Sequence, residues 1–311
     1  MQKSRIVFEL GELRYEYVPD WLQVPHQLSP VTQVAAVACT SDGCVWAATR
    51  DHLHPIMGFD PDGRYMGSIG AELGFGSEHG LYATAEDHLL VCDSGRHVVY
   101  ELDREGHVLL ELGEKDHPCD NGFDPQVPYP YCLFTIEKAG APFNKPTGAV
   151  KASDGSIWCC DGYGNASIHH FTADGQLLGT YGGPGREPGR FVNPHSIWVD
   201  KNGLVWVCDR DNHRVQVFDK DGSLVKCQEP FWPIDSPYGP STLWSDGRYM
   251  FFSCDTRGMG VYDVDTLALY GILEAPRNSP MLGHSMCGNA QGDLFFGHLD
   301  PKPMITKLKK L

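Results

Sequence analysis

The sequence predicts an all-β fold, a single six-bladed β-propeller formed by residues 1–311. Short β-rich runs alternate with turns such as Pro61-Asp-Gly and Lys220-Asp-Gly, which are typical of antiparallel hairpins. A unit with room for four strands recurs, and its six copies start at residues 35, 79, 147, 195, 241 and 284. Four of the separations, 44, 48, 46 and 43 residues, match the length of a propeller blade. Two stacked β-sandwiches are the alternative, which the regular period disfavours.

The two ends of the chain are expected to complete one blade together. The last unit, which starts at His284, has room for about three strands, one fewer than a full blade. The segment Arg5–Val18 alternates apolar and polar residues and can supply the missing strand. Pairing of this N-terminal strand with the C-terminal strand would close the ring and remove its open edges.

One separation is longer than the others. The second and third starts lie 68 residues apart, about 22 more than a typical unit here needs. The additional residues fall at about 114–140 and are rich in proline, tyrosine and acidic side chains. Insertions of this length in compact folds are often lids or binding loops. We expect this segment, called the insertion below, to be such a loop.

Composition restricts the partners of the protein. The 25 basic and 40 acidic residues give a formal net charge of −15, which disfavours nucleic acid and anionic membrane surfaces as partners. The N-terminal residues contain no apolar core of a secretory signal, and no run of about 20 apolar residues occurs. Eleven cysteines, two of them adjacent at Cys159 and Cys160, suit a reducing compartment. These features favour a cytoplasmic protein.

Residues that recur in most units are expected to support the blades. A Cys–Asp pair stands 13 and 14 residues after the start of four units. We interpret the cysteines as small buried apolar groups and the aspartates as acceptors of hydrogen bonds within or between blades. The pairs are Cys92–Asp93, Cys160–Asp161, Cys208–Asp209 and Cys254–Asp255.

Three units start with histidine: His79, His195 and His284 belong to the second, fourth and sixth units. The innermost strand of each blade lines the central channel, so equivalent positions on alternate blades lie about 120° apart at one height. Three imidazoles would then converge on the axis. Three protein nitrogens with an open fourth position are typical of a catalytic zinc site. The alternative is three histidines that hydrogen-bond to channel water or to the backbone.

Three other residues break the repeat near the same end of the ring. Arg50 and Arg210 stand 15 residues after the start of the first and fourth units, where most other units have serine, glycine or threonine. Two guanidinium groups at the mouth of a channel could grip a carboxylate, although ion pairs between blades explain the spacing equally well. Tyr163 follows one position later in the third unit. Beside arginine and zinc its pKa could fall enough for it to act as a base, and a packing role is the alternative.

Two segments carry a resemblance to a known family. PTGAVKASDGSIWCCDGYGNASIHHF (146–171) and FVNPHSIWVDKNGLVWVCDRDNHRVQVF (191–218) occur in order and at blade spacing. They resemble the NHL-repeat propellers and, more closely, the peptidyl-α-hydroxyglycine α-amidating lyases. The resemblance implies a zinc held by His79, His195 and His284, Tyr163 as the catalytic base, and Arg50 and Arg210 as substrate-binding or charge-stabilising groups. It also implies a structural Ca²⁺.

The chain departs from that family at several positions. Gly164 stands where the family has a cysteine, and Trp206 and Val217 replace two other cysteines that form a disulfide there. Ser285 occupies the place of a carboxylate that binds calcium in the family, which disfavours Ca²⁺, although the backbone carbonyl of Leu81 could still contribute. The loss of disulfides fits a cytoplasmic protein.

These observations lead us to expect a zinc-dependent carbon–nitrogen lyase. Its substrate would be an α-hydroxyglycine derivative bearing a carboxylate, and its products an amide and an α-oxo acid such as glyoxylate. Tyr163 would take the proton of the α-hydroxyl, while Arg50 and Arg210 would hold the carboxylate and balance developing charge. The alternatives are a metal-dependent hydrolase or hydratase that resembles the lactonases, and a propeller that binds partners without catalysis.

Overall fold

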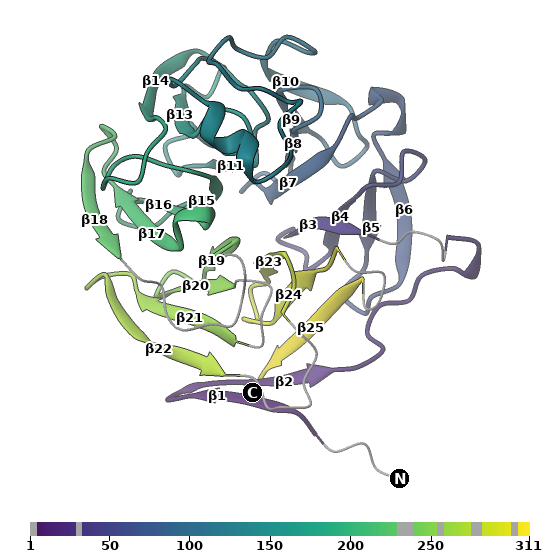
Figure 1. Ribbon diagram of the computed structural model, residues 1–311. Helices are drawn as coiled ribbons and strands as arrows, with labels where there is room; N and C mark the ends of the chain where they lie inside the picture. Colours follow the sequence, from purple (N-terminus) through teal and green to yellow (C-terminus); the bar gives the residue numbers. More distant parts are fainter. Residues whose placement is uncertain (1–4, 29–32, 229–238, 254–257, 275–281, 300–303) are drawn as a thin grey trace.

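Six antiparallel sheets stand around a central axis as the blades of a propeller (Figure 1). The computed structural model describes residues 5–28, 33–228, 239–253, 258–274, 282–299 and 304–311. Over these ranges nearly all regular structure is β, which confirms the predicted six-bladed β-propeller. Within the same ranges no helix has the length and apolar character needed to cross a bilayer.

Five blades are four-stranded meanders whose strands follow the order of the chain. Their first strands contact one another around the axis and form the wall of the channel. The first two blades are β3 (Val34–Cys39), β4 (Val45–Thr49), β5 (Ile56–Phe59) and β6 (Tyr65–Ile69), then β7 (Glu78–Ala83), β8 (Leu89–Asp93), β9 (Val98–Leu102) and β10 (Val108–Gly113). The next three are β11 (Gly148–Lys151), β12 (Ile157–Asp161), β13 (Ser167–Phe171) and β14 (Leu177–Gly182); β15 (Pro194–Val199), β16 (Val205–Asp209), β17 (Arg214–Phe218) and β18 (Leu224–Gln228); and β19 (Thr242–Ser245), β20 (Tyr249–Ser253), β21 (Gly258–Asp263) and β22 (Ala268–Glu274).

The sixth blade joins the two ends of the chain. It contains β23 (Ser285–Gly288), β24 (Leu294–Gly297), β25 (Ile305–Lys310), β2 (Leu13–Val18) and β1 (Val7–Leu10). Strand β2 pairs antiparallel with β25, so the predicted closure is confirmed. The N-terminal segment forms two strands rather than the expected one, because Gly11 adopts a φ of 57° and turns the chain back on itself.

The hydrophobic core fills the wedges between neighbouring blades. Strands β8, β12 and β16 are buried along their whole length, because adjacent blades cover both faces of each sheet. Trp206 and Val217 lie opposite each other on β16 and β17 and are almost fully buried. Packing thus fills this position, and none of the ten cysteines within the described ranges forms a disulfide.

The recurring Cys–Asp pairs support the blades as predicted. Cys92, Cys160 and Cys208 are fully buried. Asp93 accepts hydrogen bonds from the backbone N–H groups of Gly76 and Ser77, each at 2.9 Å. Asp161 and Asp209 likewise accept backbone N–H groups near the start of their own blades. The fourth pair, Cys254–Asp255, lies outside the described residues.

The insertion lies between β10 and β11 and contains the short helix η3 (Tyr131–Thr135), drawn in dark teal in Figure 1. Its buried residues Cys132 and Leu133 pack against Val192, which precedes the fourth blade. The amide Nδ2 of Asn121 donates to the carbonyl oxygen of Gly164 at 2.7 Å. These contacts fix the insertion over the third and fourth blades.

Candidate metal centre

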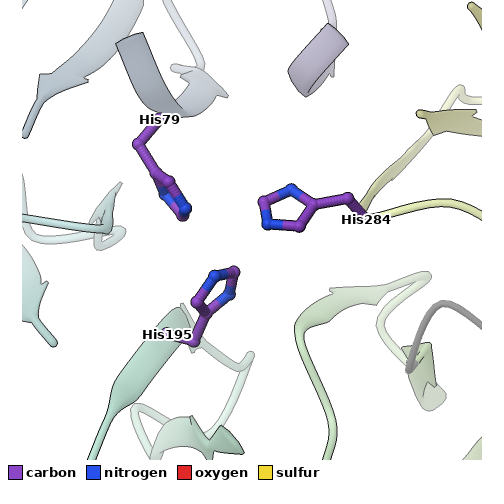
Figure 2. Close-up of side chains that lie close together, drawn as sticks. All are labelled: His79, His195 and His284. Carbon is purple, nitrogen blue, oxygen red and sulfur yellow. The ribbon is translucent and has the colours of Figure 1, made fainter. Parts of the chain in front are cut away.

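Three imidazoles converge on the axis from alternate blades (Figure 2). They belong to His79 on β7, His195 on β15 and His284, which precedes β23. One ring nitrogen from each lies within 4.8 Å of the other two, and the ring centroids are 4.7, 5.2 and 4.9 Å apart. All three side chains are buried. The structure therefore brings together the three histidines that the repeat singled out.

Backbone carbonyls of the other three blades fix the orientation of each ring. The Nδ1 atoms of the three histidines lie 2.6–2.8 Å from the carbonyl oxygens of Thr147, Ser241 and Ala35, which start the third, fifth and first blades. A carbonyl oxygen only accepts, so Nδ1 carries the proton and donates it. In the neutral ring the lone pair then sits on Nε2. Such an outer hydrogen bond is the usual support of a histidine that binds metal.

Burial keeps these imidazoles neutral at pH 7. It lowers the pKa of His79 and of His195 well below the ordinary histidine value, and the positive charge of Arg210 lowers both further. Burial also lowers the pKa of His284 to about 4. Neutral imidazole is the form that coordinates a metal ion, so the electrostatics of the site favour ligation.

Tyr163 reaches the same point from the third blade. Its hydroxyl oxygen lies 3.0 Å from Nε2 of His79 and 3.0 Å from Nε2 of His195. Gly162 permits this approach, since a Cβ at that position would lie 2.2 Å from Oδ1 of Asn193. Gly164 is equally confined, because a Cβ there would lie 2.3 Å from the carbonyl oxygen of Asn144. The close packing of Asn144 therefore explains why glycine stands at position 164.

Arg210 is the cation nearest to this tyrosine among the predicted residues. It starts the short helix η4 (Arg210–Asn212), is 6% exposed, and its Nη1 donates to the hydroxyl of Tyr163 at 3.3 Å. Burial raises the pKa of Tyr163 above its ordinary value, while Arg210 and Arg50 act in the opposite direction. The expected lowering of the tyrosine pKa is therefore not achieved by the protein groups alone.

Arg50 is the second arginine predicted for the site. It lies in the loop after β4, is exposed, and forms no hydrogen bond or ion pair with any described residue. Its charge still lowers the pKa values of His79 and Tyr163, so it faces the same end of the channel. The structure brings Arg210, but not Arg50, into contact with the tyrosine.

Two residues of the site were missed by the sequence reasoning. Tyr129, from the insertion, accepts a hydrogen bond from Nη2 of Arg210 at 2.6 Å, and only the excess length of that segment signalled it. Glu78 precedes His79 and is 1% exposed, yet neither carboxylate oxygen accepts a hydrogen bond from another residue in the described part of the chain. Burial raises its pKa to about 7. A signal was present, because the other five units have valine, proline or glycine at the equivalent position.

Beyond the histidines the channel continues as a cavity of about 90 Å³ between the six innermost strands. Small residues border it next to the imidazoles, including Gly80, Gly148 and Ser196. No aspartate or glutamate is among its described lining residues. Calcium prefers several oxygen ligands with carboxylates among them, so the chemistry of this wall favours nitrogen-bound metals at the histidines over calcium.

The fold and the site together define a six-bladed propeller with a buried three-histidine cluster that could bind a metal ion. The family model of the NHL repeat matches residues 191–218, which form most of the fourth blade. The chain is 26% identical to NHL repeat-containing protein 3 of Homo sapiens over 77% of the chain and 66% of that protein. It is 32% identical, over 50% of the chain and 40% of the relative, to a Caenorhabditis elegans protein named probable peptidyl-alpha-hydroxyglycine alpha-amidating lyase.

These matches show an NHL repeat in the fourth blade and a relation in sequence, across half of the chain, to a probable amidating lyase. The chain spans less than two thirds of the length of these curated relatives. Among solved structures, a gluconolactonase of Xanthomonas campestris superposes on it with a TM-score of 0.67 at 17% identity, covering 100% of the chain and 96% of that protein. This likeness establishes the shared fold.

Proposed function

We propose that the protein is a zinc-dependent lyase that cleaves the C–N bond of an α-hydroxyglycine derivative and releases an amide and an α-oxo acid such as glyoxylate. One observation carries the proposal. The Nε2 atoms of His79 and His195 both face the hydroxyl oxygen of Tyr163, and neither nitrogen has a proton to donate. The phenol can donate its single proton to one of them only, so a buried excess of lone pairs surrounds the axis.

Zinc fits this excess of acceptors. Three neutral imidazole nitrogens with room for a further ligand form the donor set of a catalytic zinc, and His79, His195 and His284 would hold it. Backbone carbonyls of the three intervening blades already orient all three rings, so metal binding requires little further ordering of these side chains. When bound, the ion would supply positive charge that acidifies adjacent hydroxyl groups and polarises substrate oxygen atoms.

Protein residues supply the remaining requirements of the reaction. The α-hydroxyl gives its proton to the phenolate of Tyr163, its carbon forms a C=O double bond, and the C–N bond breaks as the nitrogen takes this proton back from Tyr163 and leaves as the amide. Tyr163 would receive the hydroxyl proton, because its oxygen lies 3.0 Å from Nε2 of both His79 and His195. Arg210 stabilises the phenolate that accepts this proton. The exposed guanidinium of Arg50 is available to bind the substrate carboxylate.

The test begins with metal content and then measures turnover. Protein purified without chelators is expected to contain one zinc per chain, and His195→Ala is expected to contain none. His107→Ala, whose side chain is 77% exposed, serves as the matched control and should keep the metal. Glyoxylate release from N-acyl-α-hydroxyglycines is then measured for wild type and for Tyr163→Phe. The variant should retain zinc and lose activity by about 10²-fold or more.

Wild-type protein without stoichiometric zinc would overturn the proposal. A zinc-loaded protein that releases no glyoxylate would retain the metal centre and reject the lyase. The whole-chain likeness to a gluconolactonase favours one second candidate, a metal-dependent hydrolase, which would open a lactone ring and yield no α-oxo acid. Assaying both products from the same zinc-loaded sample separates the two reactions.

A further inference from the structure

The insertion places a second tyrosine against Arg210. The guanidinium lies between two phenol rings, with its carbon atom 5.8 Å from the centroid of Tyr129 and 5.4 Å from that of Tyr163. The hydroxyl of Tyr129 accepts from Nη2 of Arg210 at 2.6 Å and donates to Oδ1 of Asp211 at 2.8 Å. One hydroxyl thus stands between an arginine and the carboxylate that follows it in the chain.

The position of this hydroxyl prevents a stronger ion pair. Nε of Arg210 already donates to Oδ2 of Asp211 at 3.2 Å. Nε and Nη2 form one edge of a guanidinium, and a carboxylate normally binds such an edge with both oxygens. In this structure the second bond of that fork is replaced by the bridge through Tyr129. Asp211 is itself held in place, since its Oδ2 also accepts from Nδ2 of Asn193 at 2.7 Å.

We propose that Tyr129 is a positioning residue, which keeps Arg210 out of a bidentate pair with Asp211 and so leaves the guanidinium directed at Tyr163. The catalytic role of the Arg210 charge rests on the proposed lyase function. The position of its guanidinium does not depend on that function. A fully paired arginine would turn its charge toward Asp211, away from the point where Nη1 meets the Tyr163 hydroxyl at 3.3 Å. The insertion is then part of the site.

Removal of a single oxygen atom tests this inference. In Tyr129→Phe the ring still packs, but Oδ1 of Asp211 and Nη2 of Arg210 both lose their hydrogen bond to the Tyr129 hydroxyl. A crystal structure of the variant should show Nη2 bonded directly to Oδ1 and Nη1 withdrawn from Tyr163. Tyr131→Phe is the matched control, because Tyr131 lies in the same insertion and is 69% exposed. Its Arg210 should match that of wild type, and an unmoved Arg210 in Tyr129→Phe would overturn the inference.

Binding provides a second readout. The affinity of the zinc-loaded protein for glyoxylate, measured by calorimetry, should fall about tenfold in Tyr129→Phe with zinc content unchanged. The double variant Tyr129→Phe/Asp211→Asn should recover most of this loss, because an amide cannot form the charged pair. Failure of the double variant to recover affinity would show that Tyr129 acts by packing alone. Wild-type protein that turns over no α-hydroxyglycine would instead reject the proposed function, and the crystal structures would still decide the role of Tyr129.

Discussion

Glutamine in place of Glu78 is expected to stabilise the protein at neutral and alkaline pH. The carboxylate is 1% exposed and accepts no hydrogen bond from another described residue, so its charged form is poorly solvated. Burial raises its pKa from 4.5 to about 7. A difference of about 2.5 pKa units at 1.36 kcal/mol each corresponds to about 3 kcal/mol.

The sign of this contribution follows from proton binding. Between pH 4.5 and pH 7 the folded state keeps the proton on Glu78 while the unfolded state releases it. The free energy of unfolding therefore falls as the pH rises through this window, and the whole cost of about 3 kcal/mol is present above it. Glu78→Gln has nearly the same shape and carries no charge, so it should escape the cost.

Urea unfolding of the metal-free proteins provides the assay. At pH 8 the midpoint of Glu78→Gln should exceed that of wild type by the equivalent of about 3 kcal/mol, and at pH 4.5 the two should nearly coincide. An unchanged slope with urea concentration would show that the variant affects stability rather than the extent of unfolding. Equal stability at pH 8, or a less stable variant, would show that the charged carboxylate is well paired in the native protein and carries no such cost.

Three other substitutions or conditions give further tests. In the metal-free Glu78→Gln variant, the free energy of unfolding should fall as the pH drops from 6.5 toward 4, because His284 takes up its proton at a higher pH in the unfolded state than in the folded state. The melting temperature as a function of pH measures this change, and a constant melting temperature would contradict it. Gly162→Ala should lower the melting temperature and the zinc affinity together, since its Cβ meets an oxygen at 2.2 Å; an unaltered protein would show that the loop yields freely. Arg214→Met should lower the free energy of unfolding in urea by about 3–5 kcal/mol, because it leaves the fully buried Asp209 without its ion pair at 2.9 Å. A loss below about 1 kcal/mol would show that this ion pair contributes little to stability.

The repeat accounts for what the sequence could predict. Because each unit places its start at one height on the channel wall, the spacing alone locates His79, His195 and His284 relative to one another. The same spacing assigns Tyr163 to the third blade, which lies between the blades of His79 and His195. The fold followed from the turns and the period, without any knowledge of long-range contacts.

The parts that do not repeat were not accessible in this way. Tyr129 comes from a segment that has no counterpart in the other units, so no register relates it to Arg210. Its position depends on tertiary contacts, such as the packing of Leu133 on Val192. The second N-terminal strand was missed because the turn at Gly11 depends on a positive φ, which an alternating pattern does not reveal.

The pairing of β2 with β25 in the sixth blade has a consequence for biosynthesis. His284 introduces a blade whose other members include β25, which follows the rest of the propeller in chain order, and β2, which precedes most of it. A nascent chain can therefore assemble the blades that carry the other two histidines while the third still lacks a finished sheet. A tightly held ion would then report that the sixth blade has formed and the ring is closed, and chains truncated before β25 would be left without it.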